Sequence, residues 1–290
     1  MTRRRLYGIV LILKIPRRKW TLLTALIIYQ LFLSPHAHPS TDAPIDFLTE
    51  HKDKIKKYRE RVNTWKHKSY ISIYVLGRGK ILQALRQDKV YTLDLEKEVQ
   101  WVLEDINQEL RRYKIQMPPL QLVEEAGADI SIGTHDDSEY FDQIRRGFYL
   151  DDNLRYEALQ RFQGITFILD TRNYADGFNS RYDNTQFKRV ECLIWHPQLI
   201  MNNLNSETIL DAEGHPIPIQ DEYLKLEQVV RSILKHELLH ALGIGHSKAR
   251  QTANGLWLHG SVMASMTGLH WFHLSEFEIN YLKEIWNKDE

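Results

Sequence analysis

The sequence predicts an α+β fold in which long helices pack on a twisted, mixed β-sheet. Two kinds of segment support this prediction. Short stretches rich in β-branched and aromatic residues recur along the first two thirds of the chain, and three longer stretches repeat apolar residues at the spacing of a helix face. Their order is strand, helix, several strands and then two helices, which is typical of helices packed on one sheet.

Five segments are predicted to be strands. The first, residues 69–76 (SYISIYVL), alternates in the manner of a half-buried strand, and Gly77 and Gly79 end it. The other four are residues 120–123, 128–133, 164–170 and 190–195. A polar loop separates the last two segments, so they could pair as a hairpin.

Three segments are predicted to be helices. Residues 94–112 place apolar side chains three and four positions apart, with acidic residues in the first turn and basic residues in the last. Residues 226–242 form a second long helix with similar spacing. Ser275 begins the third helix, which runs to about Trp286, and Glu278 three residues after Ser275 completes a capping box.

Composition and charge limit the classes of function. The chain has 290 residues, enough for one large domain or two small ones. Its 38 basic and 38 acidic side chains balance, so we expect no nucleic acid among its partners. Its single cysteine, Cys192, cannot form an internal disulfide, so the fold depends on its apolar core, or on its core and a metal. Nothing in the sequence sets the oligomeric state.

Residues 1–40 are predicted to be a signal peptide or a signal anchor. Seven Lys and Arg side chains precede an apolar segment at residues 20–33 (WTLLTALIIYQLFL), which is the order of an export signal. This segment is shorter than the roughly 20 residues that span a bilayer, and no small-x-small cleavage pattern follows it. We therefore expect an exported protein that is secreted, periplasmic or anchored at the outer face of a membrane through residues 20–33.

Two regions follow this predicted signal. Residues 41–64 are densely charged and are interpreted as a tether or a propeptide. Residues 65–290 are expected to form the folded domain, because the first strand pattern begins shortly after Trp65.

The residues that indicate chemistry lie at the end of the second predicted helix. His236 and His240 are four positions apart and share a helix face, so they can bind one metal ion, and Glu237 lies beside them. Gly243 lets the chain leave the helix and brings His246 back as a third ligand. Three imidazole ligands leave a fourth tetrahedral position open, which is typical of a catalytic zinc site.

These residues predict one catalytic Zn²⁺ held by His236, His240 and His246. Glu237 is expected to act as the general base that activates the attacking water and later delivers the proton to the leaving amine.

The eleven-residue pattern HExxHxxGxxH resembles the zinc signature of the metzincin peptidases. Met263, in the tripeptide SVM, is similar to the methionine of the Met-turn of that family, with Met266 as the alternative. Ser247, directly after the third histidine, is similar to the matrixin branch. Two weaker similarities to matrixins are the ADI stretch at residues 128–130 and Leu274-Ser275. The resemblance covers roughly residues 65–290, and only residues 236–266 carry it specifically.

The resemblance implies a zinc-dependent endopeptidase that hydrolyses peptide bonds in protein or peptide substrates, with residues 65–290 as a metzincin-like catalytic domain. It implies an extended substrate paired antiparallel to an edge strand, for which residues 164–170 are the candidate. It also implies that Met263 packs beneath the ligands without binding the metal. The S1′ pocket would lie between helix 226–242 and the segment after His246.

Other features leave alternatives open. Seventeen positions separate His246 from Met263, which is longer than in matrixins, and no cysteine-switch peptide is recognisable. The loop before the active-site helix offers candidate ligands for a Ca²⁺ ion, although an ordinary solvated loop explains it as well: Asp211, Glu213, His215, Asp221 and Glu222. Two other functions remain open, namely a catalytically silent metal-binding and interaction module on a metzincin shell, and a zinc hydrolase of a non-protein amide such as a cell-wall peptide.

Overall fold

A computed structural model describes most of the second half of the chain and much of the first. The described residues are 55–56, 59–60, 62–125, 127–137, 164–169, 189–246, 250–251, 257–258, 260–264 and 268–287. They belong to one compact unit, Phe47–Glu290. The predicted export signal at residues 1–40, with its apolar segment 20–33, lies outside the described residues, as do Ser247 and Met266.

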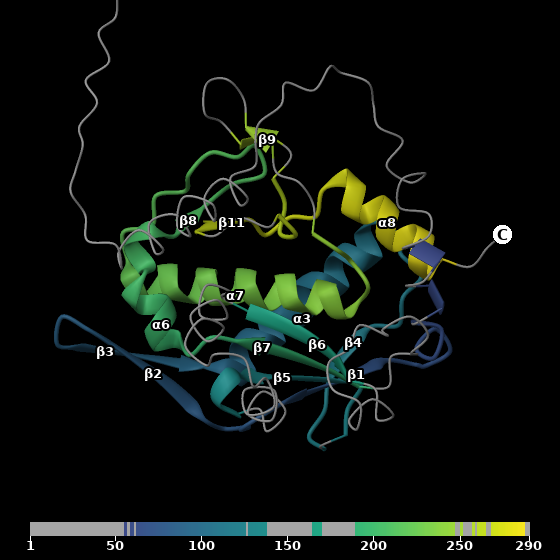
Figure 1. Cartoon of the computed structure of the whole chain (residues 1–290), viewed down its shortest axis with the longest axis horizontal. Helices are drawn as coiled ribbons and strands as arrows, with labels where there is room; N and C mark the ends of the chain where they lie inside the picture. Colours follow the sequence, from purple (N-terminus) through teal and green to yellow (C-terminus); the bar gives the residue numbers. More distant parts are fainter. Residues whose placement is uncertain are drawn as a thin grey trace, which may run out of the picture. The chain divides into compact units, whose positions relative to one another are not determined.

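The centre of the structure is a mixed five-stranded sheet (Figure 1). Its strands, in spatial order, are β4 (Leu120–Leu122), β1 (Ile71–Val75), β5 (Ile130–Thr134), β7 (Arg189–Ile194) and β6 (Gly164–Leu169). The first four are parallel, and β6 pairs antiparallel with β7 at one edge. All five predicted strands are therefore confirmed, together with the predicted hairpin pairing of the last two.

Three long helices accompany this sheet. They are α3 (Leu95–Arg112), α7 (Glu222–Ala241) and α8 (Glu276–Trp286). The Asp94 carboxylate caps α3, and the predicted capping box of Ser275 and Glu278 at the start of α8 is present. Helix α7 begins four residues before its predicted start, because the Asp221 carboxylate accepts hydrogen bonds from the first free backbone N–H groups.

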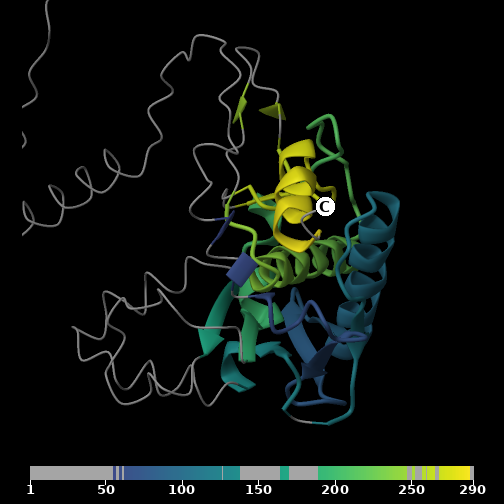
Figure 2. The ribbon, with the colours of Figure 1, turned by 90° about the vertical axis from the view of Figure 1, so that its right-hand side faces the viewer.

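Helix α7 is the element that positions the site. In two views at right angles it crosses one face of the sheet, with α3 beside it (Figures 1 and 2). The paired short strands β8 (Thr208–Ile209) and β11 (Leu269–His270), together with α8, lie on the side of α7 away from the sheet. Its buried apolar side chains join one core with those of α3 and with Ile71, Ile73 and Val75 of β1. The described residues thus form a mixed α/β structure, which is compatible with the predicted α+β class.

Several smaller elements were not predicted from the sequence. They are β2 (Ile81–Arg86) and β3 (Lys89–Asp94), which form an antiparallel hairpin, the short helix α6 (Pro197–Asn202), the short strands β9 (Arg250–Gln251) and β10 (Trp257–Leu258), and two 3₁₀ turns, η2 (His135–Asp137) and η4 (Leu204–Ser206). The β2–β3 hairpin was not predicted because its two-residue turn consists of Gln87 and Asp88. Both have positive φ, 48° and 63°, a conformation that Asn-Gly sequences usually mark.

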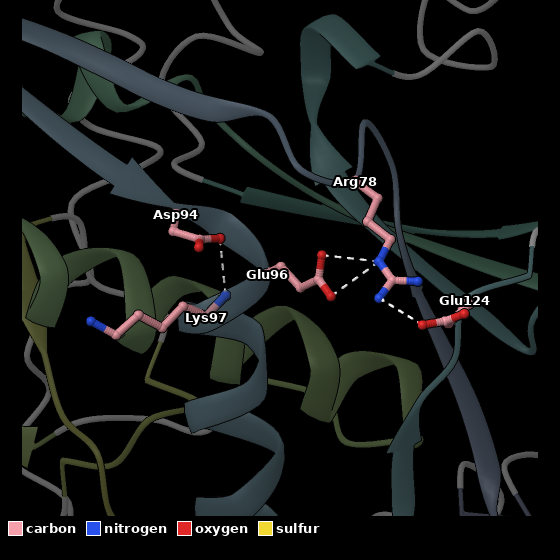
Figure 3. A network of polar contacts seen from close by, with 5 residues as sticks. All are labelled: Arg78, Asp94, Glu96, Lys97 and Glu124. Carbon is pink, nitrogen blue, oxygen red and sulfur yellow. Dashed lines mark hydrogen bonds and ion pairs between the residues drawn. The ribbon is translucent and has the colours of Figure 1, made fainter.

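An arginine joins the start of α3 to two loops that follow strands of the sheet (Figure 3). The Nε atom of Arg78, in the turn after β1, lies 3.1 Å from both carboxylate oxygens of Glu96 in the first turn of α3. Its terminal nitrogen donates to Glu124 after β4, at 3.2 Å. This network links the first turn of α3 to the chain after β1 and after β4.

The packed core extends to the N-terminal side of the predicted domain start. Ile55 and Val62 are buried in the main core together with Trp65. The predicted boundary between residues 64 and 65 stays a prediction, but apolar anchoring begins within the segment interpreted as a tether. None of the helices among the described residues combines the length and apolarity needed to cross a membrane.

Candidate metal centre

The last two turns of α7 and the chain just beyond it bring three histidines together. His236 and His240 lie one turn apart on α7. The helix ends at Ala241, and Gly243 takes a φ of 100°, a left-handed conformation that glycine adopts without strain. The chain then turns back, so that His246 faces the two helical histidines.

The three imidazoles converge through their Nε2 atoms. The distance from His240 Nε2 is 3.0 Å to His236 Nε2 and 3.1 Å to His246 Nε2, and the third side of the triangle is 3.2 Å. Within the part of the chain that the structure describes, this is the one cluster of three or more His, Cys, Asp or Glu side chains able to hold a metal ion.

Backbone carbonyl groups fix the tautomers of two of these rings. His236 Nδ1 lies 2.6 Å from the carbonyl oxygen of Val262, and His240 Nδ1 lies 2.7 Å from that of Ile244. A carbonyl oxygen can only accept, so both Nδ1 atoms must carry the hydrogen. In these two neutral rings each Nε2 atom then carries a lone pair. The lone pairs point at each other and repel, and a cation bound between them would turn this repulsion into attraction.

Burial keeps these rings neutral. It lowers the pKa of His236 to about 4 and that of His240 to about 3, with the neighbouring histidines adding to the effect, and it lowers the pKa of His246 as well. Near pH 7 the metal-free protein therefore presents three unprotonated nitrogen ligands. A metal ion does not have to displace protons from them.

The spacing of the three nitrogen atoms suits zinc. Zn–N bonds of about 2.0–2.1 Å in a tetrahedral arrangement place the nitrogens roughly 3.3 Å apart. The 3.0–3.2 Å triangle is close to that value, so His236, His240 and His246 could hold the ion without a large rearrangement. The sequence-based grouping of these three ligands agrees with the coordinates.

Glu237 occupies a buried position between α7 and the edge strand β6. Its side chain is 5% exposed, and its Oε2 atom lies 2.7 Å from the hydroxyl of Thr166 in β6. Burial raises the pKa of Glu237 to about 8, while the hydrogen bond from Thr166 opposes this shift. A carboxyl group with such a pKa can take up and release a proton near neutral pH, as a general base must.

The segment around Met263 contacts the site through its backbone. Met263 is fully buried in the main core, and the preceding residue, Val262, supplies the carbonyl oxygen that binds His236. The hydroxyl of Ser261 donates to the buried carboxylate of Glu278 in α8. The turn that holds Met263 is thereby tied both to the first ligand and to the last helix.

Three contacts of the site were not identified from the sequence. Val262 and Ile244 act through backbone carbonyls, which leave no side-chain signature. Thr166 lay inside a predicted strand, and its role depends on the register of β6 against β7, in which Thr166 is opposite Cys192. The alternation of side chains along a strand predicts that Thr166 and Gly164 lie on the same face of β6. It does not predict that this face lies against Glu237.

Two other histidines that the structure describes, His270 and His135, each lie against a carboxylate outside the three-histidine cluster. His270 Nε2 lies 2.6 Å from the buried carboxylate of Glu207. His273 is half-buried, and burial lowers its pKa. Farther away, His135 Nε2 lies 3.0 Å from Asp136. His259 lies outside the described residues.

The carboxylates of the loop before α7 are also engaged. Asp211 accepts backbone hydrogen bonds from Glu213 and His215 in its own loop, and Asp221 caps α7. Glu222 accepts a hydrogen bond from the Tyr91 hydroxyl and pairs with Arg86 of the β2–β3 hairpin. These contacts account for three of the four carboxylates of the candidate calcium loop, the exception being Glu213, and calcium binding stays a prediction.

Comparisons with known proteins add no functional assignment. The chain matches no protein-family model and no curated protein sequence. One similar solved structure is the "GM1 bound form of the ECX AB5 holotoxin", with 14% sequence identity over 78% of this chain and 72% of the other, and a TM-score of 0.36. A similarity at this level supports no conclusion about fold or function.

Proposed function

We propose that this protein is a zinc-dependent endopeptidase of the metzincin type, close to the matrixins. One observation carries the proposal: three histidine Nε2 atoms converge at 3.0–3.2 Å, two of them with their tautomers set by backbone carbonyls, and a buried glutamate follows the first of these histidines in α7. A structural zinc site would use a fourth protein ligand. Among the described residues, the three imidazoles have no fourth protein ligand beside them.

His236, His240 and His246 would hold the metal, and Glu237 would handle the proton. When bound, zinc would supply the positive charge that acidifies a water molecule and polarises the carbonyl group of the scissile bond. The Glu237 carboxylate would take the proton from the attacking water and return it to the leaving amine. Its burial between α7 and β6 limits competing bulk water, so the proton stays with the reacting groups.

The position of β6 supports the proposed mode of substrate binding. This strand lies at one edge of the sheet and runs antiparallel to β7, and its Thr166 side chain contacts Glu237. We propose that an extended peptide pairs with the outer edge of β6, which would bring its backbone alongside the metal centre. The substrate would be a protein or peptide.

Two further parts of the proposal rest on the sequence resemblance. Met263 would be the methionine of the Met-turn, and its burial next to Val262 supports this role. Export from the cytoplasm is proposed from the basic and apolar segments within residues 1–40.

The test is a cleavage assay on the purified full-length protein with a peptide library and a denatured protein. We expect hydrolysis that a zinc chelator abolishes and that added zinc restores. A fully zinc-loaded protein that cleaves neither substrate would instead support a catalytically silent binding module. Cleavage of cell-wall peptides alone would support the hydrolase of a non-protein amide.

A further inference from the structure

The Glu237 side chain is held by two residues of β6 that lie on the same face of that strand. Gly164 and Thr166 are two positions apart, so both face α7. The antiparallel ladder with β7 fixes their places, with Gly164 opposite Ile194 and Thr166 opposite Cys192. The edge strand is therefore set against Glu237 by its regular pairing.

Thr166 contacts Glu237 at two points. Its Oγ1 atom lies 2.7 Å from the carboxylate oxygen Oε2 and 2.9 Å from the backbone carbonyl oxygen of the same residue. The hydroxyl has one hydrogen and can donate to only one of these two oxygens at a time, but its place within 3 Å of both restricts the torsion angles between the carboxylate and the main chain. The Glu237 side chain has three rotatable bonds, and this double contact selects one of their combinations.

Gly164 allows the second carboxylate oxygen to pack closely against β6. A Cβ atom at this position would lie 2.7 Å from both Cγ and Oε1 of Glu237 and 2.9 Å from Cγ2 of Ile233. These separations are below the contact distance of carbon and oxygen atoms, so any larger residue would displace the carboxylate or the strand. Oε1 thus lies against the glycine while Oε2 is bound by the threonine.

We propose that Thr166 and Gly164 are positioning residues for the general base, which orient the Glu237 carboxylate from the face of β6 that is turned toward α7. This inference rests on the proposed function, since it concerns the orientation of the base in that reaction. Misplacement of a reacting group by about 1 Å can lower the rate roughly 100-fold, so a group that fixes the carboxylate affects turnover more than substrate binding.

The activity test compares Thr166→Val, which removes the hydroxyl with little change in shape, with Thr166→Ser, which keeps it. We expect Thr166→Val to lower kcat about 10- to 100-fold, as the loss of a hydrogen bond to a charged group would, with KM within about twofold and an unchanged zinc content. Thr166→Ser should restore kcat to within a few-fold of wild type. Thr92→Val, at an exposed position of β3, is the matched control and should change neither constant.

A second measurement tests the contact in the metal-free protein, without reference to activity. A double-mutant cycle combines Thr166→Val with Glu237→Leu and follows the melting temperature of each variant. Thr166→Val should lower the melting temperature by about 3–8 °C when Glu237 is present, and by clearly less when residue 237 is Leu. Additive effects would overturn the proposed contact.

The outcomes separate this inference from the proposed function. If wild type hydrolyses peptides and Glu237→Gln does not, but Thr166→Val keeps the wild-type kcat, only the positioning role fails. If the zinc-loaded wild type is inactive on every peptide, the proposed function fails, and the double-mutant cycle still decides whether Thr166 holds Glu237.

Discussion

His236 Nδ1 lies 2.6 Å from the carbonyl oxygen of Val262, which joins the first ligand of the candidate metal centre to the turn that holds Met263. These two residues are 26 positions apart in the sequence. The hydroxyl of Ser261 in turn donates to Glu278 of α8. The orientation of His236 therefore depends on a helix near the end of the chain, and this dependence can be tested.

Ser261→Ala should weaken zinc binding although all three histidines remain. Without the hydroxyl, the turn loses its bond to the buried Glu278 carboxylate, and the Val262 carbonyl is held less firmly against His236. Loss of a residue that supports a ligand typically costs about 10- to 100-fold in metal affinity. Competition with a chelator of known affinity measures the change. Ser206→Ala, at an exposed position, is the control, and an unchanged affinity in Ser261→Ala would contradict the proposed dependence.

In the metal-free protein, Glu237→Gln should become more stable relative to wild type as the pH rises from 5 to 8. Burial raises the pKa of Glu237 to about 8, so between its ordinary value of 4.5 and that pH the folded chain binds more protons than the unfolded chain. Wild type accordingly loses this contribution as the pH rises, and the glutamine variant does not. Thermal melting in the presence of a chelator checks the trend, and a difference that stays constant would refute it. Bound zinc should remove the trend, because a nearby dication favours the ionised carboxylate.

The histidines should act in the opposite direction on the acidic side. Burial holds the pKa of His236 near 4 and that of His240 near 3, below the ordinary 6.5, so the unfolded chain binds more protons in between. Their contribution to the stability of the metal-free protein is fully present above pH 6.5 and is lost as the pH falls toward 3. His236→Gln should therefore flatten the acid side of the stability profile. Urea unfolding from pH 4 to pH 7 measures this, and a slope equal to that of wild type would count against the lowered pKa of His236.

Lys235→Met should destabilise the protein by about 1.5–3 kcal/mol, because it removes charge-assisted hydrogen bonds and leaves two partly buried carboxylates without their partner. The Lys235 side chain is 0% exposed, and its Nζ atom lies 2.6 Å from Asp105 and 2.7 Å from Glu109, both in α3. The same atom donates to the backbone carbonyl of Phe272. Urea unfolding gives the free energy, with the exposed Lys97→Met in α3 as the control. A decrease in the free energy of unfolding below about 1 kcal/mol, the value typical of surface ion pairs, would show that Lys235 does not join α7 to α3 through these carboxylates.

Much of the fold follows from local patterns. The helix periodicity of residues 94–112, the capping box at Ser275 and the alternating strands are local signals, and each corresponds to an element of the structure. The β2–β3 hairpin was missed because its turn, Gln87-Asp88, lacks the residues that usually mark positive φ. Sheet order and the place of β6 at an edge depend on pairing between distant segments, which no local pattern specifies.

The candidate site was predictable in part for the same reason. His236, Glu237 and His240 share one helix, and Gly243 and His246 follow within six residues, so spacing alone groups them. Thr166 reaches Glu237 across 71 positions, and Val262 reaches His236 through a backbone atom. Contacts of that kind arise only from the tertiary fold. The sequence therefore predicted that the three histidines lie together, with Glu237 in the same helix, but it did not predict the residues that contact them.

In the proposed function, Glu237 is the general base of a zinc peptidase and not a metal ligand. The most direct test is the turnover of Glu237→Gln, measured on a cleaved peptide at a zinc content equal to that of wild type. General-base assistance contributes about 10²–10⁴ in rate, so the variant should keep one zinc ion per chain and lose at least 100-fold in kcat. Release of zinc by this variant, or turnover within a few-fold of wild type, would contradict the proposed mechanism even with the three histidines in place.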